Sequence, residues 1–282
     1  MSKALAWLPA VRLATLADVA QSHSPEGPPP NQGNETTSRS QTWRSGTNAN
    51  ASALPIAHRG DPVGHRENTL EAFEAARVLG AEMVELDCRL TRDGQVVVLH
   101  DATLARLWGD PRPLAEIDGD EARSLRQGGY RIPSLEEVLD TVALQVMVDL
   151  PDPAAAGPSW SVVRDAGALE RCIFAGNTSG LQHLRELSPD LRIALTWDKI
   201  ELPAPALLHE LRPEWWNPYY RLATTAAVEW AHASGMGVSV WTVDSRRDIA
   251  RVLDAGADAV ISNQVARVID ELAGRRAQPT SP

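Results

Sequence analysis

Short apolar runs separated by segments of helical pattern are the feature that most restricts how this chain can fold. The runs are Leu54–His58, Met83–Asp87, Val146–Leu150, Arg171–Ala175, Arg192–Thr196, Trp215–Asn217, Val238–Thr242 and Ala259–Ser262. Helical patterns lie between most of them, at Thr69–Leu79, Leu135–Thr141, Gly180–Leu187, Ala204–Leu211, Thr225–Ala233 and Ser245–Ala255. Eight strands that alternate with helices predict an α/β fold, a TIM (β/α)8 barrel in preference to an open doubly wound sheet. Catalytic side chains in such a barrel lie at the C-terminal ends of the strands.

The connection after the second run is too long for a simple loop between a strand and a helix. The turn Asp93-Gly94 followed by the apolar run Gln95–His100 predicts a β-hairpin. The irregular stretch Ala102–Pro133 comes next. We interpret this stretch as a small insertion after the second strand that caps the barrel mouth.

Both ends of the chain differ in composition from the rest. Residues 21–52 consist of Pro, Gly, Ser, Asn and Thr with almost no large apolar residue. We therefore expect a disordered N-terminal tail over 1–52, a barrel over 53–275 and a second disordered tail over 276–282. Arg12 interrupts the apolar run near the start of the chain, a pattern that favours a cytoplasmic protein over an exported one.

Charge and apolar content exclude several classes of protein. Hydrophobic residues make up 43% of the chain, which is sufficient for a buried core. A formal net charge of -10 argues against nucleic-acid binding but permits a phosphate substrate bound beside a cation. No apolar run approaches the roughly 18 residues of a membrane span, so stable membrane association is not expected. Cys88 and Cys172 lie in apolar runs and are predicted to be small core residues.

Two carboxylates two residues apart on a predicted strand give the sharpest chemical signal. Glu85 and Asp87 share one face of the second run, while Val84 and Leu86 occupy the opposite face. Two inward carboxylates repel each other, and burying them unpaired is costly. A divalent cation relieves both problems, and oxygen ligands favour Ca²⁺ or Mg²⁺. The alternation alone is equally compatible with an exposed edge strand that has an ordinary polar face.

Three further residues at the ends of predicted strands fit the same site. Asp149 near the end of the third run could cap the following segment, but beside Glu85 and Asp87 it completes a set of oxygen ligands. His58 and His100 each end an apolar run. Either one alone is more simply a hydrogen-bonded structural residue. As a pair of imidazoles that titrate near neutrality, they suit a general acid and a general base.

Glu67-Asn68 precedes the first predicted helix. Asn68 suits the N-cap of that helix, and Glu71 three residues later suits the reciprocal carboxylate of a capping box. Capping accounts for Asn68 but leaves Glu67 unexplained.

Several short motifs follow one another in a fixed order along the chain. They are His58-Arg59-Gly60, Glu67-Asn68-Thr69, Glu85-Leu86-Asp87, Thr91-Arg92-Asp93-Gly94, His100-Asp101, Ile132–Leu139, Val240–Val243 and Gly256–Ser262. In order and spacing they resemble the glycerophosphodiester phosphodiesterase family. The resemblance covers roughly residues 54 to 272 and is densest from 56 to 104.

This resemblance implies a TIM barrel that hydrolyses small glycerophosphodiesters, such as glycerophosphocholine, to glycerol 3-phosphate and an alcohol. It also implies one bound Ca²⁺ or Mg²⁺. By motif, the metal ligands are Glu85, Asp87 and Asp149, and the acid–base pair is His58 and His100. The resemblance assigns Arg59 to the phosphate and Glu67 to the metal and hydroxyl side of the site.

The sequence departs from the family pattern at one position. The family typically carries Glu-x-Lys on the third strand, whereas this chain has Asp149-Leu150-Pro151. The acid is shorter, and a cation that would stabilise the transition state is missing. Lys199 could replace it from another loop, although a surface lysine is the simpler interpretation. Trp197 and Trp241 lie at strand ends and suit either the substrate pocket or the barrel core.

Two alternatives compete with this assignment. One is a lysophospholipase D or a phospholipase D-type lyase that acts on lipid phosphodiesters, for which Leu104, Leu107 and Trp108 of the insertion would supply an apolar mouth. The other is a degenerate barrel that binds a phosphodiester without turnover, for which Pro151 is the only support.

Overall fold

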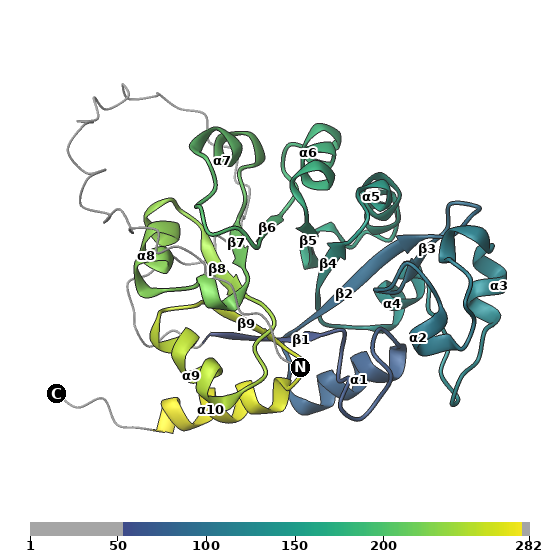
Figure 1. Ribbon diagram of the computed structural model, residues 1–282, viewed down its shortest axis with the longest axis horizontal. Helices are drawn as coiled ribbons and strands as arrows, with labels where there is room; N and C mark the ends of the chain where they lie inside the picture. The colour runs from purple at the N-terminus through teal and green to yellow at the C-terminus, as the bar shows by residue number, and fades with distance from the viewer. Residues whose placement is uncertain (1–52, 278–282) are drawn as a thin grey trace, which may run out of the picture. The chain divides into compact units, whose positions relative to one another are not determined.

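The computed structural model describes residues 53–277, and these form a closed barrel of parallel strands (Figure 1). The sheet order is β1-β9-β8-β7-β6-β5-β4-β2, and the pairing of β1 with β2 closes the ring. The strands of the ring are β1 (Leu54–His58), β2 (Met83–Leu90), β4 (Gln145–Leu150), β5 (Cys172–Gly176), β6 (Ile193–Trp197), β7 (Trp215–Pro218), β8 (Gly237–Val240) and β9 (Ala259–Ser262). The predicted TIM barrel and its eight strands are confirmed.

Helices surround the strands, as Figure 1 shows. The longer ones are α1 (Leu70–Leu79), α4 (Leu135–Thr141), α5 (Ala156–Asp165), α6 (Thr178–Leu187), α7 (Pro205–Leu211), α8 (Thr225–Ala233), α9 (Arg246–Asp254) and α10 (Val265–Ala277). Three single turns of 3-10 helix connect them, η3 (Pro153–Ala155), η4 (Leu169–Arg171) and η5 (Tyr220–Leu222).

Two of these helices, α5 and α10, are absent from the sequence prediction. Gly157 and Pro158 lie in the first turn of α5 and weaken its helical pattern. Burial of Ala156, Ser159 and Val163 accompanies the helix that forms in spite of them. Helix α10 lies beyond the last predicted strand and continues to residue 277, past the predicted barrel boundary at 275.

Alternation along the strands divides the core into two layers. On β2, Val84 and Leu86 point outward into the large cluster that the strands share with the helices. Met83 points inward, into the smaller cluster inside the ring. Because side chains alternate with a period of two, Glu85 and Asp87 lie on the inner face with Met83, as predicted. The inner cluster consists of Leu54, Ile56, Met83, Met147, Ile173, Ala175, Ala194, Trp215, Ala259 and Ile261.

The segment between β2 and α4 forms the predicted hairpin and insertion. Strand β3 (Val96–Val98) pairs antiparallel with β2. The short helices α2 (Ala105–Trp108), η2 (Leu114–Glu116) and α3 (Gly119–Ser124) follow, beyond β3 in Figure 1. They share an apolar cluster with β3 that includes Leu104, Trp108 and Ile117. The chain then returns to β3, where the Val98 amide donates to the carbonyl oxygen of Pro133 over 2.9 Å.

The tail predicted over 1–52 lies outside the described residues, as do residues 278–282 of the second tail. Within 53–277, none of the helices combines the length and the apolar character that crossing a membrane requires. Cys88 and Cys172 are free and buried, which agrees with their predicted place in the core.

Candidate active site

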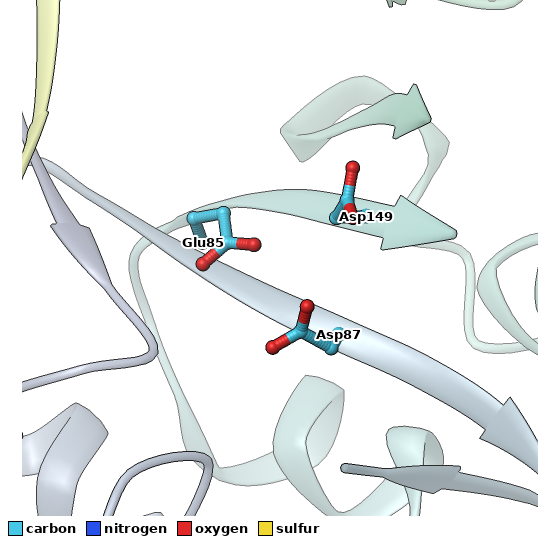
Figure 2. A group of neighbouring side chains, drawn as sticks. All are labelled: Glu85, Asp87 and Asp149. Atoms are coloured by element: carbon cyan, nitrogen blue, oxygen red, sulfur yellow. The ribbon is translucent and has the colours of Figure 1, made fainter. Parts of the chain in front are cut away.

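Three carboxylates from two neighbouring strands meet at the C-terminal end of the barrel. In the register of β2 and β4, Asp87 lies directly beside Asp149, and Glu85 lies one pleat further down the same face. One oxygen of each carboxylate lies within 4.8 Å of the others, and Figure 2 shows the three side chains gathered between the two strands. The structure therefore brings together all three residues that the sequence predicts as principal metal ligands.

The electrostatics of this cluster are unfavourable without a cation. Burial raises the pKa of Glu85 well above its ordinary value, and repulsion from Asp87 and Asp149 raises it further. Burial, followed by repulsion from Asp87, raises the pKa of Asp149 to about 7. Three oxygen donors with no nitrogen or sulfur ligand among them match the preferences of Ca²⁺ and Mg²⁺. The cluster thus fits a divalent cation by both charge and donor type.

Asp87 is fixed by two residues of the loop between β1 and α1. The Asn68 side-chain amide donates to Asp87 Oδ2 over 2.7 Å, and Arg59 Nε lies 3.0 Å from the same oxygen. Both Asn68 and Arg59 have left-handed backbones, with φ of 57° and 59°, a conformation that is uncommon for an arginine. This strain at the loop is compensated by the contacts that orient Asp87.

The predicted capping role of Asn68 is wrong. Thr69 is the N-cap of α1, and its hydroxyl accepts from the Ala72 amide. The left-handed backbone turns the Asn68 side chain toward Asp87, where it is buried. Gly60 allows this tight loop, because a Cβ there would lie 2.6 Å from the carbonyl carbon of Ala72.

His58 at the end of β1 has a fixed tautomer. Its Nδ1 lies 2.7 Å from Asn263 Oδ1, and the Asn263 amide nitrogen donates to Asp244 Oδ2 over 2.9 Å. Because Asn263 is oriented as an acceptor toward His58, Nδ1 carries the proton and Nε2 presents a lone pair. Burial, followed by the charge of Arg59, lowers the pKa of His58. His58 Nε2 lies 3.9 Å from Glu85, so a neutral imidazole faces the carboxylates.

His100 follows β3 and enters the site from the hairpin. Its Nδ1 lies 2.8 Å from Asp101 Oδ1, and its backbone carbonyl accepts a 2.6 Å hydrogen bond from Arg89 Nε. The carboxylate of Asp101 can only accept when ionised, so Nδ1 carries a proton here as well. Nε2 is therefore the nitrogen of His100 that is available for proton transfer.

Glu67 belongs to a different network from the one predicted. Its Oε1 accepts from Arg59 over 2.9 Å and from Arg106 of the insertion over 2.7 Å. Arg106 Nε also donates to Asp101 over 2.6 Å. Burial opposes ionisation of Glu67, but the two arginines outweigh it and lower its pKa. Glu67 lies outside the carboxylate cluster and links the insertion to the barrel, so the geometry gives no support to a metal-binding role.

The three carboxylates, the two histidines and Arg59 border a cavity of about 240 Å³ at the barrel mouth. Its wall consists of His58, Arg59, Glu85, Asp87, His100, Met147, Asp149, Pro151, Thr196, Asn217, Trp241, Thr242 and Ile261. Trp241 lines the cavity, and its indole nitrogen donates to the Asn217 carbonyl over 2.9 Å.

Lys199 and Trp197 lie away from the cavity. Lys199 is exposed, and its ammonium lies 5.1 Å from the centre of the Trp197 ring. Trp197 belongs to the outer core. The suggestion that Lys199 replaces the missing cation at residue 151 therefore finds no support in the geometry.

Sequence reasoning missed Asn263, Asp244 and Arg106. Asn263 directly follows β9, and β9 pairs with β1, so barrel closure brings its side chain to His58. A polar residue at the end of the last predicted strand was a usable signal for Asn263. The contacts of Asp244 and Arg106 depend on long-range packing of loops, for which one sequence offers no signal.

Comparison with known proteins finds consistent relatives. The model of the glycerophosphoryl diester phosphodiesterase family matches residues 58–267. A glycerophosphodiester phosphodiesterase of Caldanaerobacter subterraneus subsp. tengcongensis is 30% identical over 236 residues, which cover 77% of this chain and 96% of that protein. A phosphodiesterase of Oleispira antarctica, solved in complex with the product sn-glycerol-3-phosphate, has a TM-score of 0.73 at 20% identity and covers 80% of this chain and 99% of that one. A glycerophosphodiester phosphodiesterase of Thermotoga maritima has a TM-score of 0.66 at 24% identity, with coverage of 77% and 97%.

Proposed function

The chain belongs to the glycerophosphoryl diester phosphodiesterase family, and on that premise we propose that it hydrolyses a glycerophosphodiester to glycerol 3-phosphate and an alcohol. The observation that carries the proposal is the cluster of Glu85, Asp87 and Asp149 in one cavity with two histidines. Such a cavity combines a site for a cation with two groups that can transfer protons.

Glu85, Asp87 and Asp149 are the residues that would hold one Ca²⁺ or Mg²⁺. When bound, the cation supplies Lewis-acid polarisation of the phosphoryl group and lowers the pKa of a coordinated hydroxyl. Asn68 and Arg59 keep Asp87 in the orientation that this requires.

His58 suits the general base. Its Nδ1 proton is committed to Asn263, and burial favours the neutral imidazole. The free Nε2 can therefore take the proton from the glycerol hydroxyl that attacks phosphorus. That attack forms a five-membered cyclic phosphate and expels the alkoxide of the second alcohol.

His100 suits the general acid. Nδ1 is held by Asp101, so Nε2 is the atom that can deliver a proton to the leaving alkoxide. Water then opens the cyclic phosphate, with the two histidines in exchanged roles. Arg59, which lines the same cavity, contributes positive charge near the phosphate.

The test is a diester panel read by release of glycerol 3-phosphate. Glycerophosphocholine, glycerophosphoethanolamine, glycerophosphoglycerol and lysophosphatidylcholine are compared, each with chelator and with Ca²⁺ or Mg²⁺ added back. We expect turnover of at least one small diester, loss of turnover with chelator, and recovery on metal addition. Turnover confined to lysophosphatidylcholine would instead favour a lipid-directed enzyme. Binding of metal and product without turnover of any diester would favour the degenerate barrel.

The two histidines are tested by replacement with glutamine. His58→Gln and His100→Gln should each lower kcat by about 10²- to 10⁴-fold, the usual contribution of a positioned acid or base. His183→Gln is the matched control, because His183 is exposed on α6, lies 3.8 Å from Glu186 and is outside the cavity wall. Full activity in a folded His58→Gln or His100→Gln protein contradicts the two-histidine mechanism.

A further inference from the structure

Arg89 is a cation beside the site for which the mechanism above has no role. It follows Asp87 by two residues on β2, so it shares the inner face with Asp87 and Glu85. Its Nε donates to the carbonyl oxygen of His100 over 2.6 Å, which holds the guanidinium beside a residue of the cavity wall.

Arg89 and Pro151 each follow one of two paired carboxylates on neighbouring strands. Strands β2 and β4 pair with Asp87 beside Asp149. Arg89 is two residues beyond Asp87 on β2, and Pro151 is two residues beyond Asp149, the first residue after β4 and part of the cavity wall. The chain thus carries a cation on the strand that neighbours β4, at the same sequence distance from Asp87 as Pro151 is from Asp149.

Arg89 also has hydrogen-bond donors that no described residue engages. Arg59 is engaged by Asp87 and Glu67, and Arg106 is engaged by Glu67 and Asp101. In the part of the chain that the structure describes, the two terminal nitrogens of Arg89 have no hydrogen-bond partner. A guanidinium held by Nε alone presents a fork of donors that matches two phosphate oxygens.

The net charge of the site favours a further cation near the phosphate. Three carboxylates and one divalent cation leave a net negative charge, and the charge of Arg59 is shared with Asp87 and Glu67. A phosphodiester adds one negative charge, and its transition state adds another. A further cation beside the phosphate is therefore favoured most strongly in the transition state.

We propose that Arg89 binds the non-bridging oxygens of the substrate and product phosphate, and that it supplies from β2 the positive charge that is missing at Pro151. The inference rests on the proposed function, since it names a phosphate-binding residue of the same site.

The first experiment removes the charge and keeps a hydrogen-bond donor for the His100 carbonyl. Arg89→Gln should lower kcat/KM for the best small diester about 10- to 100-fold. It should also weaken sn-glycerol-3-phosphate binding, measured by calorimetry, about 10-fold. Arg92→Gln is the matched control, because Arg92 lies on the same hairpin, is 59% exposed and pairs with Asp118. This control should change both quantities by less than about twofold.

The second experiment replaces the positive charge of Arg89 with one at residue 151, directly after β4. Pro151→Lys in the Arg89→Gln background should recover at least about 10-fold in kcat/KM and should restore product binding. Proline has no backbone N–H, so the exchange removes no backbone donor. Pro151→Lys alone provides the control for folding, by thermal melting.

Three outcomes would overturn the proposal. The first is wild-type kcat/KM and product affinity in a folded Arg89→Gln protein. The second is lower kcat with unchanged product affinity, which would make Arg89 a positioning residue for His100. The third is an Arg89→Gln/Pro151→Lys protein no better than Arg89→Gln while Pro151→Lys alone folds and is active. If the wild type released no glycerol 3-phosphate, the proposed function would fail, and the calorimetric comparison would still test Arg89.

Discussion

The two halves of the barrel mouth differ sharply in chemistry. Strands β1 to β4 contribute the charged half, which consists of His58, Arg59, Glu85, Asp87, His100 and Asp149. Strands β6 to β8 and the residues that follow them contribute the neutral half, which consists of Thr196, Asn217, Trp241 and Thr242.

Hydrogen bonds join Thr196, Asn217 and Trp241 of the neutral half. Asn217 donates to the Thr196 hydroxyl over 3.3 Å and accepts from Ser239 over 2.9 Å, and its carbonyl accepts from Trp241. Buried polar groups that are fully paired form a rigid wall. In the charged half, by contrast, burial and the neighbouring carboxylates raise the pKa of Glu85 and of Asp149. The comparison indicates that the charged half is arranged for chemistry at some cost to stability, and the neutral half for shape.

The largest expected effect comes from neutralising one ligand in the charged half. Asp149→Asn keeps the shape of the side chain but removes an anionic oxygen from the cluster. We expect kcat/KM to fall about 10³-fold, equivalent to ~4 kcal/mol of transition-state stabilisation. Ca²⁺ and Mg²⁺ affinity, measured by calorimetry, should fall in parallel. Unchanged metal affinity in this variant would remove Asp149 from the ligand set.

A smaller effect is expected in the neutral half. Trp241→Ala removes part of the cavity wall and the bond to the Asn217 carbonyl but no charge. We expect kcat/KM to fall about 10-fold, by an amount that differs between diesters with different alcohol groups, while metal affinity stays the same. Kinetics on the diester panel measure this. If Trp241→Ala lowered kcat/KM equally for every diester and also weakened metal binding, the two halves would not differ in function.

The smallest effect concerns the stability of the metal-free protein. The folded pKa of Asp149 is about 7, above its ordinary value of 3.8, because burial and Asp87 favour its protonated form. The folded state therefore binds more protons than the unfolded state between these values, and stability falls as pH rises. Lowering the pH from 8 to 6 in chelator should stabilise the protein by about 1 kcal/mol, or roughly 2–4 °C in Tm.

Two comparisons sharpen this pH test. Asp149→Asn should show a smaller gain in stability on acidification. The gain that remains comes from Glu85, whose pKa is also raised. Below pH 6.5 the lowered pKa of His58 acts in the opposite direction, because the folded state resists protonation there. If the Tm of the metal-free protein rose from pH 6 to 8, this would contradict the conclusion that the carboxylates of the charged half cost stability.

The parts of this site that the sequence predicted follow from local rules. A period of two placed Glu85 and Asp87 on one face, and the barrel placed strand ends at one mouth. Asn68 was misassigned because its residue type suits a cap, whereas its role depends on a left-handed backbone set by the loop. Asn263 and Arg106 were missed because their partners lie far away in sequence. Local pattern therefore predicted the groups that meet in the cavity but not the residues that orient them.

The return of the insertion to its starting point has a consequence for how this enzyme can diversify. The backbone bond between Val98 and Pro133 joins the two ends of the segment on the edge of the hairpin. A segment with joined ends can lengthen or shorten at little additional entropic cost to the rest of the chain. The insertion is therefore a position at which a loop from another barrel could be exchanged. Arg106 is the side chain that such a transplant would need to retain, since it connects Glu67 to Asp101.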